Sequence, residues 1–281
     1  MGVISRPAAN TEALVLRAWP CGETSAVVSL LTRDHGYVKV IAKGARSGRS
    51  RLRPLIEPGR LGTVEFSLDP GRELQFLRGG EVDLDPLAES PTLEKSAYLL
   101  GALELVDRCR PLGGDQGPLD DRGQTPVVAH LFAVCGRFVR MLSSQSCNRP
   151  DLLFFAFEWE LLARHGMAPE VSSCVACGRA QADLELSTLQ FSPAEGGIVC
   201  GPCIQAGGIK GGRPLGKAAW DHLRDMARTG IDLDREGEPT LTRPLRREMG
   251  ALLHRFLGYH LPGYRLPAAL DLLRAGKDST G

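Results

Sequence analysis

Short apolar segments alternate with turn-forming residues over the first 85 residues of the chain. Five segments rich in Val, Leu and Phe occur there, separated by breaks rich in Gly, Pro, Asp or Arg. They are EALVLRAW (12–19), AVVSLLTRD (26–34), GYVKVIAKG (36–44), LGTVEFSLD (61–69) and ELQFLRGGEV (73–82). Such segments are typical of β-strands. Five short strands in so short a stretch predict a small closed barrel of the OB-fold kind, because closure removes exposed strand edges.

The apolar period becomes helical after Pro91. Segments 92–109 and 125–143 carry apolar residues at helical spacing, and a loop rich in Gly, Asp and Pro separates them. The positions are Ala97, Leu100, Leu103 and Val106 in the first segment, and Val128, Leu131, Cys135, Phe138 and Leu142 in the second. Both segments are therefore predicted to be helices that bury one face.

Segment 150–166 is apolar nearly all round and predicts a helix at the centre of a bundle. We expect Asp151 to be its N-cap and Gly166 its C-cap. Helical spacing returns at 216–229 and 242–261, and these helices are expected to pack on the earlier ones. In the last of them, the shared apolar face consists of Leu245, Met249, Leu252, Leu253 and Phe256.

These patterns predict an α+β chain with several domains. We expect an OB-fold β-barrel at 1–85, an α-helical domain at 86–170 that resumes at 213–281, and a cysteine-rich insertion at 171–212. With 43% hydrophobic and 24% charged residues, the composition is that of a globular protein. No apolar stretch approaches the length of a membrane helix, and the amino terminus has no signal-peptide core. We therefore expect a cytoplasmic protein with no membrane partner.

Four of the eight cysteines form two pairs in the insertion. Cys174 and Cys177 precede Cys200 and Cys203 in the spacing C-x₂-C-x₂₂-C-x₂-C. A two-residue gap lets both sulfurs of a turn reach one ion, and two such turns close a tetrahedron of thiolates. The spacing predicts a zinc ribbon with one structural ion and no open coordination position. Iron could use the same ligands.

The cysteine pattern allows two other interpretations. Cys200-Gly-Pro-Cys203 is also the redox tetrapeptide of thioredoxin-like proteins, but IQAGGIKGGRP (204–214) cannot form the long helix that must follow such a centre. Four incidental thiols are the remaining alternative.

No catalytic signature is found. GGRPLGK (211–217) resembles a nucleotide P-loop, but Ala218 replaces the hydroxyl residue that would bind magnesium and no apolar strand precedes the loop. The six histidines are scattered, and lone helical histidines are seldom catalysts. We therefore predict a protein that is not an enzyme.

Residues 39–60 concentrate positive charge on a Gly- and Ser-containing loop. Seven cations occur there against a single acid, Glu57. They are Lys39, Lys43, Arg46, Arg49, Arg51, Arg53 and Arg60. Such a loop can follow a phosphate chain without reading bases. A solvated loop that aids solubility is the alternative, but the acids that normally alternate with surface cations are missing, so DNA binding is favoured.

The predicted barrel contains four aromatic residues whose rings could stack on bases. Trp19 and Tyr37, next to turns, are candidates. Phe66 and Phe76 lie in apolar strands and are expected in the core.

The chain resembles the bacterial RecO family of recombination mediators over nearly its whole length. The segment 21–58 is similar to that family's barrel pattern, and CVACG (174–178) and GGIVCGPC (196–203) resemble its zinc knuckles. The matching barrel positions are Gly22, Glu23, Thr32, Gly36, Ala42, Lys43, Gly44, Ala45 and Arg46. YHLPGYRLPAALDLL (259–273) departs from the family, since Leu266-Pro267 stands where a polar cluster is expected.

The resemblance implies an OB-fold that binds single- and double-stranded DNA and anneals complementary strands. The resemblance also implies that the protein acts with RecR to load RecA on strands coated by single-strand-binding protein. The helical domain would contact the acidic tail of that coating protein. Such a protein would be cytoplasmic and nucleoid-associated. A nucleic-acid enzyme and a protein-binding adaptor are the rival classes.

Overall fold

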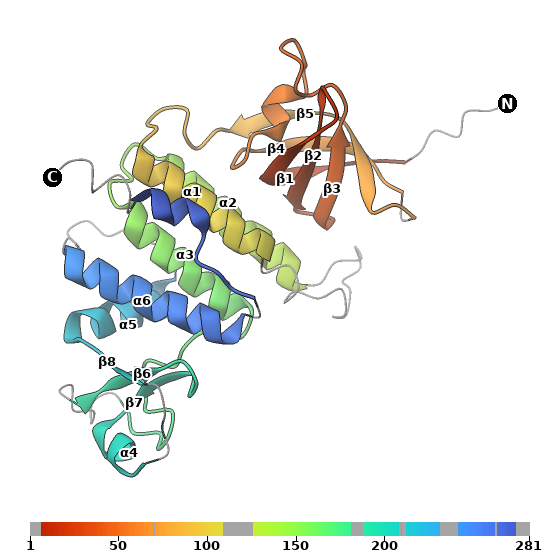
Figure 1. The fold of residues 1–281 in the computed structure, drawn as a ribbon. Coiled ribbons are helices and arrows are strands. Elements are labelled where there is room, and N and C mark those ends of the chain that lie inside the picture. Colours follow the sequence, from red (N-terminus) through yellow and green to blue (C-terminus); the bar gives the residue numbers. More distant parts are fainter. Residues whose placement is uncertain are drawn as a thin grey trace. The chain divides into compact units, whose positions relative to one another are not determined.

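The computed structural model describes residues 7–69, 71–108, 126–180, 188–207, 209, 212–230, 241–261 and 263–273. The chain divides into two compact units. Figure 1 labels the helices and strands of both. One contains Met1–Pro150 and Pro267–Gly281, and the other contains Asp151–Leu266. Among the described helices, none has the length and apolar character needed to cross a membrane.

The first unit begins with a closed five-stranded barrel. Its strands are β1 (Ala8–Cys21), β2 (Ser25–Thr32), β3 (Gly36–Ala42), β4 (Leu61–Ser67) and β5 (Leu74–Leu84), in the barrel order β1-β2-β3-β5-β4. β3 pairs with β5 in parallel, and the other neighbours are antiparallel. The predicted OB-like barrel is confirmed. A short 3-10 helix, η1 (Arg53–Ile56), lies between β3 and β4.

The barrel core is built from inward-facing residues of all five strands. Phe66 is fully buried, and Val28, Val40 and Leu30 surround the same interior. β4 and β5 approach each other closely at Gly80, whose φ is 149° and where a Cβ would lie 2.2 Å from a backbone oxygen of β4. Glycine is required there, because a side chain would force the strands apart.

Two helices follow the barrel in the first unit, α1 (Leu93–Arg108) and α2 (Pro126–Ser143). Hydrogen bonds join barrel and α1: Tyr37 Oη donates to the Val106 carbonyl at 2.8 Å, and Ser29 Oγ donates to Asp107 at 3.1 Å. Most predicted apolar positions are buried, but Leu100 is 40% exposed. The side chain of Val128 lies outside the described residues.

The divergent carboxy-terminal segment packs on α1. It forms a 3-10 helix, η5 (Ala268–Asp271), preceded by Pro267. The backbone N–H of Ala268 donates to Glu104 Oε2 at 2.9 Å, and Leu270 is buried. This segment thus contributes apolar contact where a polar cluster was expected.

The second unit combines three long helices with a small sheet. Its elements are α3 (Pro150–Arg164), β6 (Gln190–Ser192), β7 (Gly197–Val199), α4 (Gly201–Gln205), β8 (Arg213–Pro214), α5 (Lys217–Thr229) and α6 (Arg243–His260). The sheet order is β7-β6-β8. Every residue of α3 from Asp151 to Trp159 is buried, as its apolar sequence predicts.

The first acidic residue of α3 pairs with α6 and does not cap its own helix as the sequence predicts. Asp151 was expected to be an N-cap, which is wrong, because α3 already begins at Pro150 and the Asp151 carboxylate instead lies 2.8 Å from Arg246 Nε of α6.

Glu158 is completely buried, and burial raises the pKa of its carboxyl well above the usual value. His254 Nδ1 lies 3.3 Å from Glu158 and 2.6 Å from the Tyr264 hydroxyl.

The two phenylalanines of the barrel differ in burial, which leads to a prediction for stability. The Phe66 ring is in the core, whereas the expectation for Phe76 is wrong, because its ring is half-buried with the Lys43 ammonium 5.0 Å above it. Phe66→Ala should lower the free energy of unfolding by about 3–5 kcal/mol, because it leaves a cavity. Phe76→Ala should lower it by only about 1 kcal/mol. Urea unfolding followed by circular dichroism measures both, and equal losses would contradict this assignment.

Candidate nucleic-acid interface and metal centre

The basic loop between β3 and β4 projects from the barrel (Figure 1), and two of its seven cations are already engaged at its ends. Lys39 Nζ on β3 lies 2.5 Å from a Glu73 carboxylate oxygen. Arg60 donates to Asp85 Oδ2 from Nε at 2.9 Å and from Nη2 at 2.7 Å, and its Nη1 donates to the Pro54 carbonyl. Both side chains therefore help to hold the ends of the loop in place.

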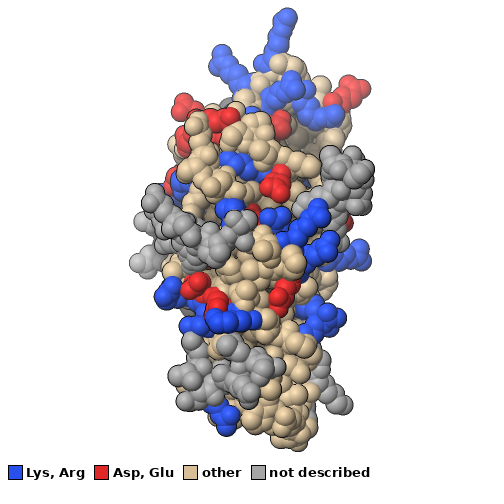
Figure 2. Space-filling model, turned by 90° about the vertical axis from the view of Figure 1, so that its left-hand side faces the viewer, with Lys and Arg blue, Asp and Glu red and all other residues tan. Residues whose placement is uncertain are grey.

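The other five cations are exposed. They are Lys43, Arg46, Arg49, Arg51 and Arg53, here called the rim cations. Within the part of the chain that the structure describes, none of the rim cations forms an ion pair with a carboxylate. Lys and Arg side chains project from the barrel at the top of Figure 2. Their positive charge is therefore available to a polyanion.

The loop that carries the rim cations is held by the barrel. The Arg46 backbone N–H donates to the Thr24 carbonyl at 2.8 Å, and its guanidinium donates to two carbonyls of the same turn at 3.3 Å. Ala45, Leu55 and Ile56 are buried in the barrel core. Because the loop is anchored at both sides, less conformational entropy is lost when a ligand binds it.

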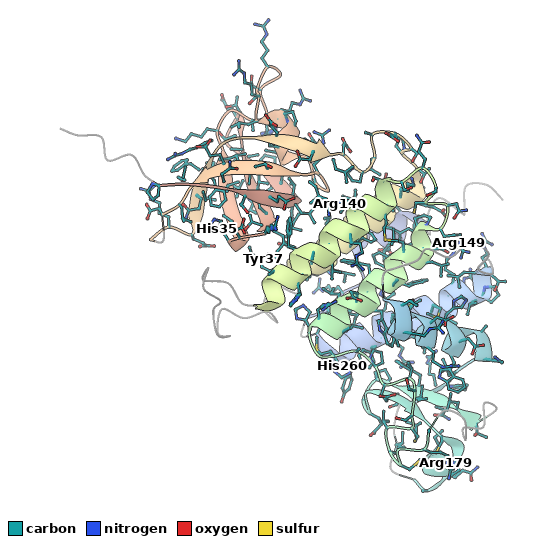
Figure 3. All side chains as sticks on the ribbon, turned by 180° about the vertical axis from the view of Figure 1, so that it is seen from behind. His35, Tyr37, Arg140, Arg149, Arg179 and His260 are labelled. Atoms are coloured by element: carbon teal, nitrogen blue, oxygen red, sulfur yellow. The ribbon has the colours of Figure 1, made fainter. Side chains whose placement is uncertain are left out.

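The two candidate stacking residues occupy different places. Trp19 is half-buried and lines a groove of about 330 Å³ together with Arg46 and Arg53. Tyr37, labelled in Figure 3, is half-buried and uses its hydroxyl to bind the Val106 carbonyl of α1. Trp19 is therefore the one that the structure brings to the rim cations, a difference that the sequence did not reveal.

The four paired cysteines converge on one point of the second unit. The sulfur atoms of Cys174, Cys177, Cys200 and Cys203 all lie within 4.8 Å of one another. The first pair sits in a turn closed by Gly178, whose φ is 71° and whose N–H donates to the Cys174 carbonyl at 2.8 Å. Cys200 caps the five-residue helix α4, and Cys203 lies inside it. Four thiols at this separation can hold a tetrahedral metal ion.

The electrostatics of the cluster also fit a cation. Burial acts to raise the pKa of Cys174, but N–H groups of Cys200, Cys177 and Ala176 point at its sulfur and bring the pKa to about 6. Hydrogen bonding to the Cys200 thiol and its neighbours raises the pKa of Cys203 to about 12. Full deprotonation of all four thiols would therefore require a positive ion among them.

Among the described residues around the cysteines, the local buried cluster is small. It consists of Cys174, Val199 and Cys200. The segment is joined to α6 by packing of the Phe191 ring against the tilted Phe256 ring, with ring centroids 5.7 Å apart, and by a 3.0 Å contact between His260 Nε2 and a carbonyl of the β6–β7 turn. His260 is labelled in Figure 3. A bound ion would supply folding stability that so small a core does not provide.

Neither the P-loop-like motif nor the thioredoxin-like motif has the geometry of the site that it resembles. In GGRPLGK, Arg213–Pro214 form strand β8, the Gly216 N–H donates to Glu248 at 2.9 Å and Lys217 pairs with Asp221 at 2.6 Å. A carboxylate thus occupies the position where a P-loop binds phosphate. The helix after Cys200 has only five residues, whereas a thioredoxin-like centre requires a long one.

Comparison with known proteins gives matches along most of the chain. The N-terminal domain of the recombination protein O family matches residues 7–83, and its C-terminal domain matches residues 128–269. Three similar proteins are each called DNA repair protein RecO. That of Bacillus pumilus is 28% identical and covers 94% of this chain and 95% of its own length. Those of Myxococcus xanthus and an Anaeromyxobacter species are 30% and 32% identical, over 96% and 90% of this chain and 98% and 92% of their own.

The different environments of Arg60 and Arg51 lead to a prediction. Arg60→Ala should lower the free energy of unfolding by about 1–2 kcal/mol, because Asp85 and the Pro54 carbonyl lose their charged donor. Arg51→Ala should change it by less than about 0.5 kcal/mol, since that side chain is exposed. Thermal and urea unfolding measure both, and an Arg60 variant as stable as the wild type would show that the pair does not hold the loop.

Proposed function

The chain belongs to the RecO family of DNA repair proteins, and on this premise we propose that it is a non-enzymatic mediator that binds DNA and anneals complementary single strands. Family membership places it in recombination repair. In our proposal the barrel holds the DNA through the loop residues predicted from the sequence, and the helical domain holds a structural ion.

The observation that carries the proposal is the set of rim cations. Five exposed positive groups on an anchored loop, without a carboxylate partner among the described residues, match the repeating charge of a phosphate backbone. Binding releases condensed counterions, and each phosphate neutralised on a single strand should contribute about 0.7 to the salt slope. Lys39 and Arg60, also predicted as DNA-binding, would contribute mainly by holding the loop.

Annealing follows from the same charges. Two complementary strands repel through their phosphates, and cations between them lower this repulsion without any covalent step. Base pairing then supplies the free energy. This accounts for a family role that needs neither hydrolysis nor a nucleotide.

Partners and location are proposed from the family. We place the protein in the cytoplasm at the nucleoid, where it would act on single- and double-stranded DNA. With RecR it would help to load RecA on strands coated by single-strand-binding protein, whose tail is a further partner. Arg137, Arg140 and Arg164 are candidate contacts for that tail, although Arg164 is paired with Glu160 at 2.6 Å.

For the metal centre we propose one zinc ion held by Cys174, Cys177, Cys200 and Cys203. Four thiolates from two turns are the usual donor set of a structural zinc site, which leaves no position open for catalysis. The ion would supply folding free energy to the small segment around it.

Reversal of charge on the loop tests DNA binding. The combined change Arg46→Glu, Arg49→Glu, Arg51→Glu and Arg53→Glu should reduce affinity for a single-stranded oligonucleotide by at least about 100-fold at moderate salt, because four phosphate contacts become repulsive. Fluorescence anisotropy over a salt series measures this. The melting temperature should fall only slightly, since these side chains are exposed and, among the described contacts, Arg46 alone loses two 3.3 Å hydrogen bonds to carbonyls.

A variant with Arg228→Glu, Arg243→Glu, Arg247→Glu and Arg255→Glu, four exposed positions in the helices of the second unit, is the control for net charge. It should bind DNA within about twofold of the wild type. Wild-type affinity in the quadruple variant at low salt would refute the proposed interface. Equal losses in both proteins would show that net charge alone is responsible.

Replacement of one ligand tests the metal. Cys200→Ser should reduce bound zinc from about one ion per chain to nearly none and lower the unfolding temperature of the second unit, because the ion contributes to its folding. Cys21→Ser, at an exposed cysteine outside the cluster, should keep the ion. Elemental analysis after dialysis measures the content, and full zinc retention by Cys200→Ser would disprove the ligand set.

A further inference from the structure

A groove beside the rim cations combines an aromatic ring with positive charge. It has a volume of about 330 Å³, at the lower end of the range of small-molecule sites. The residues that matter among its lining are Trp19, Pro20, Arg46, Arg53, Ile56 and Glu57. All of them belong to the first unit, on β1, the loop and η1.

The walls of this groove are fixed before any ligand arrives. Trp19 lies on β1, where its backbone pairs with Val27 of β2. Ile56 is buried in the barrel core and anchors η1, which begins at Arg53. Arg46 is tied through its guanidinium to two carbonyls of the β1–β2 turn. A groove with anchored walls can hold a flat group with little loss of conformational entropy.

Trp19 is suited to stacking. It is half-buried on the outside of the barrel, and the Arg17 guanidinium lies 5.8 Å from its ring centroid. The other two tryptophans, Trp159 and Trp220, are buried in the second unit, and Trp220 Nε1 donates to the Val171 carbonyl. Trp19 therefore differs from the others in being a partly exposed tryptophan placed among arginines.

We propose that this groove is a subsite for one unpaired base, stacked on Trp19, while Arg46 and Arg53 bind the flanking phosphates. The inference rests on the proposed function and deepens it, because it gives the interface a preference for single strands. Phosphate contacts alone occur on single and double strands alike. A base in a duplex is already paired and stacked, and would have to be extruded to enter the groove.

The groove favours a nucleotide over an acidic peptide. Two guanidinium groups suit both ligands, and Glu57, which also lines the groove, would repel a phosphate as well as a peptide carboxylate, so the difference lies in the base. The same carboxylate can accept a hydrogen bond from the amino group of a base. Aromatic stacking tolerates every base, so the subsite would select unpaired strands without selecting sequence.

The test uses the full-length protein with a single-stranded oligonucleotide, a blunt duplex and a single strand with abasic sites. Trp19→Ala should weaken single-strand binding by about tenfold and duplex binding by less than about twofold, because one stacking contact is lost. Trp19→Phe should retain most of the affinity. The wild type should bind the abasic strand about tenfold more weakly, whereas Trp19→Ala should bind both strands alike.

Tryptophan fluorescence gives a second measurement on the unmodified protein. Because Trp159 and Trp220 are buried, quenching by a single strand should come from Trp19, and the abasic strand and the duplex should quench much less. Tyr37→Phe, which removes only a hydroxyl bonded to α1, is the matched control and should bind as the wild type does.

The inference is wrong if Trp19→Ala binds single strands normally, or if it loses single-strand and duplex binding equally. It is also wrong if the variant loses affinity for an acidic peptide but not for the oligonucleotide. Each outcome is distinguishable from failure of the proposed function, which is tested by the quadruple arginine variant. Loss of binding in that variant together with normal binding by Trp19→Ala would overturn the base subsite alone.

Discussion

Repulsion between like charges is the constraint on which both functional parts of this chain depend. The rim cations lie close together on one loop with no carboxylate partner among the described residues, and four thiols meet within 4.8 Å of one another. The cations repel one another, and the four sulfurs would do so once deprotonated, so each cluster is stabilised when an opposite charge enters it. In our proposal, a polyanion is the ligand of the first cluster and a metal cation is the ligand of the second.

The surrounding fold holds these charges in place by different means. On the barrel, the loop ends are fixed by Lys39 with Glu73 and by Arg60 with Asp85, and the buried side chains of η1 join the loop to the core. In the second unit the cysteine turns have little core of their own and rely on Phe191 packing against Phe256 of α6. The barrel can therefore present its charges without a ligand, whereas in our proposal the cysteine segment depends on a bound ion for stability.

This difference matters for how a mediator would work. Reversible contact with phosphates requires an interface that is already formed and that loses affinity steeply with salt. A structural ion instead has to stay bound through many cycles, which four thiolates with no open position allow. In our proposal, the binding role thus belongs to the first unit and the structural ion to the second.

The sequence by itself determined the elements and the ligands whose signals are local. The five strands follow from short Val-, Leu- and Phe-rich segments between turn-forming residues, the long helices from apolar residues at helical spacing, and the cysteine cluster from its C-x₂-C pairs. Tertiary structure decided which residues of a local group act together. Lys39 and Arg60 look like the other cations in sequence, but their partners Glu73 and Asp85 lie at least 25 residues away. Likewise, Asp151 meets Arg246 instead of capping its helix, Tyr37 is used by α1, and Trp19 lies in the groove, because such pairings depend on chain closure and not on neighbouring residues.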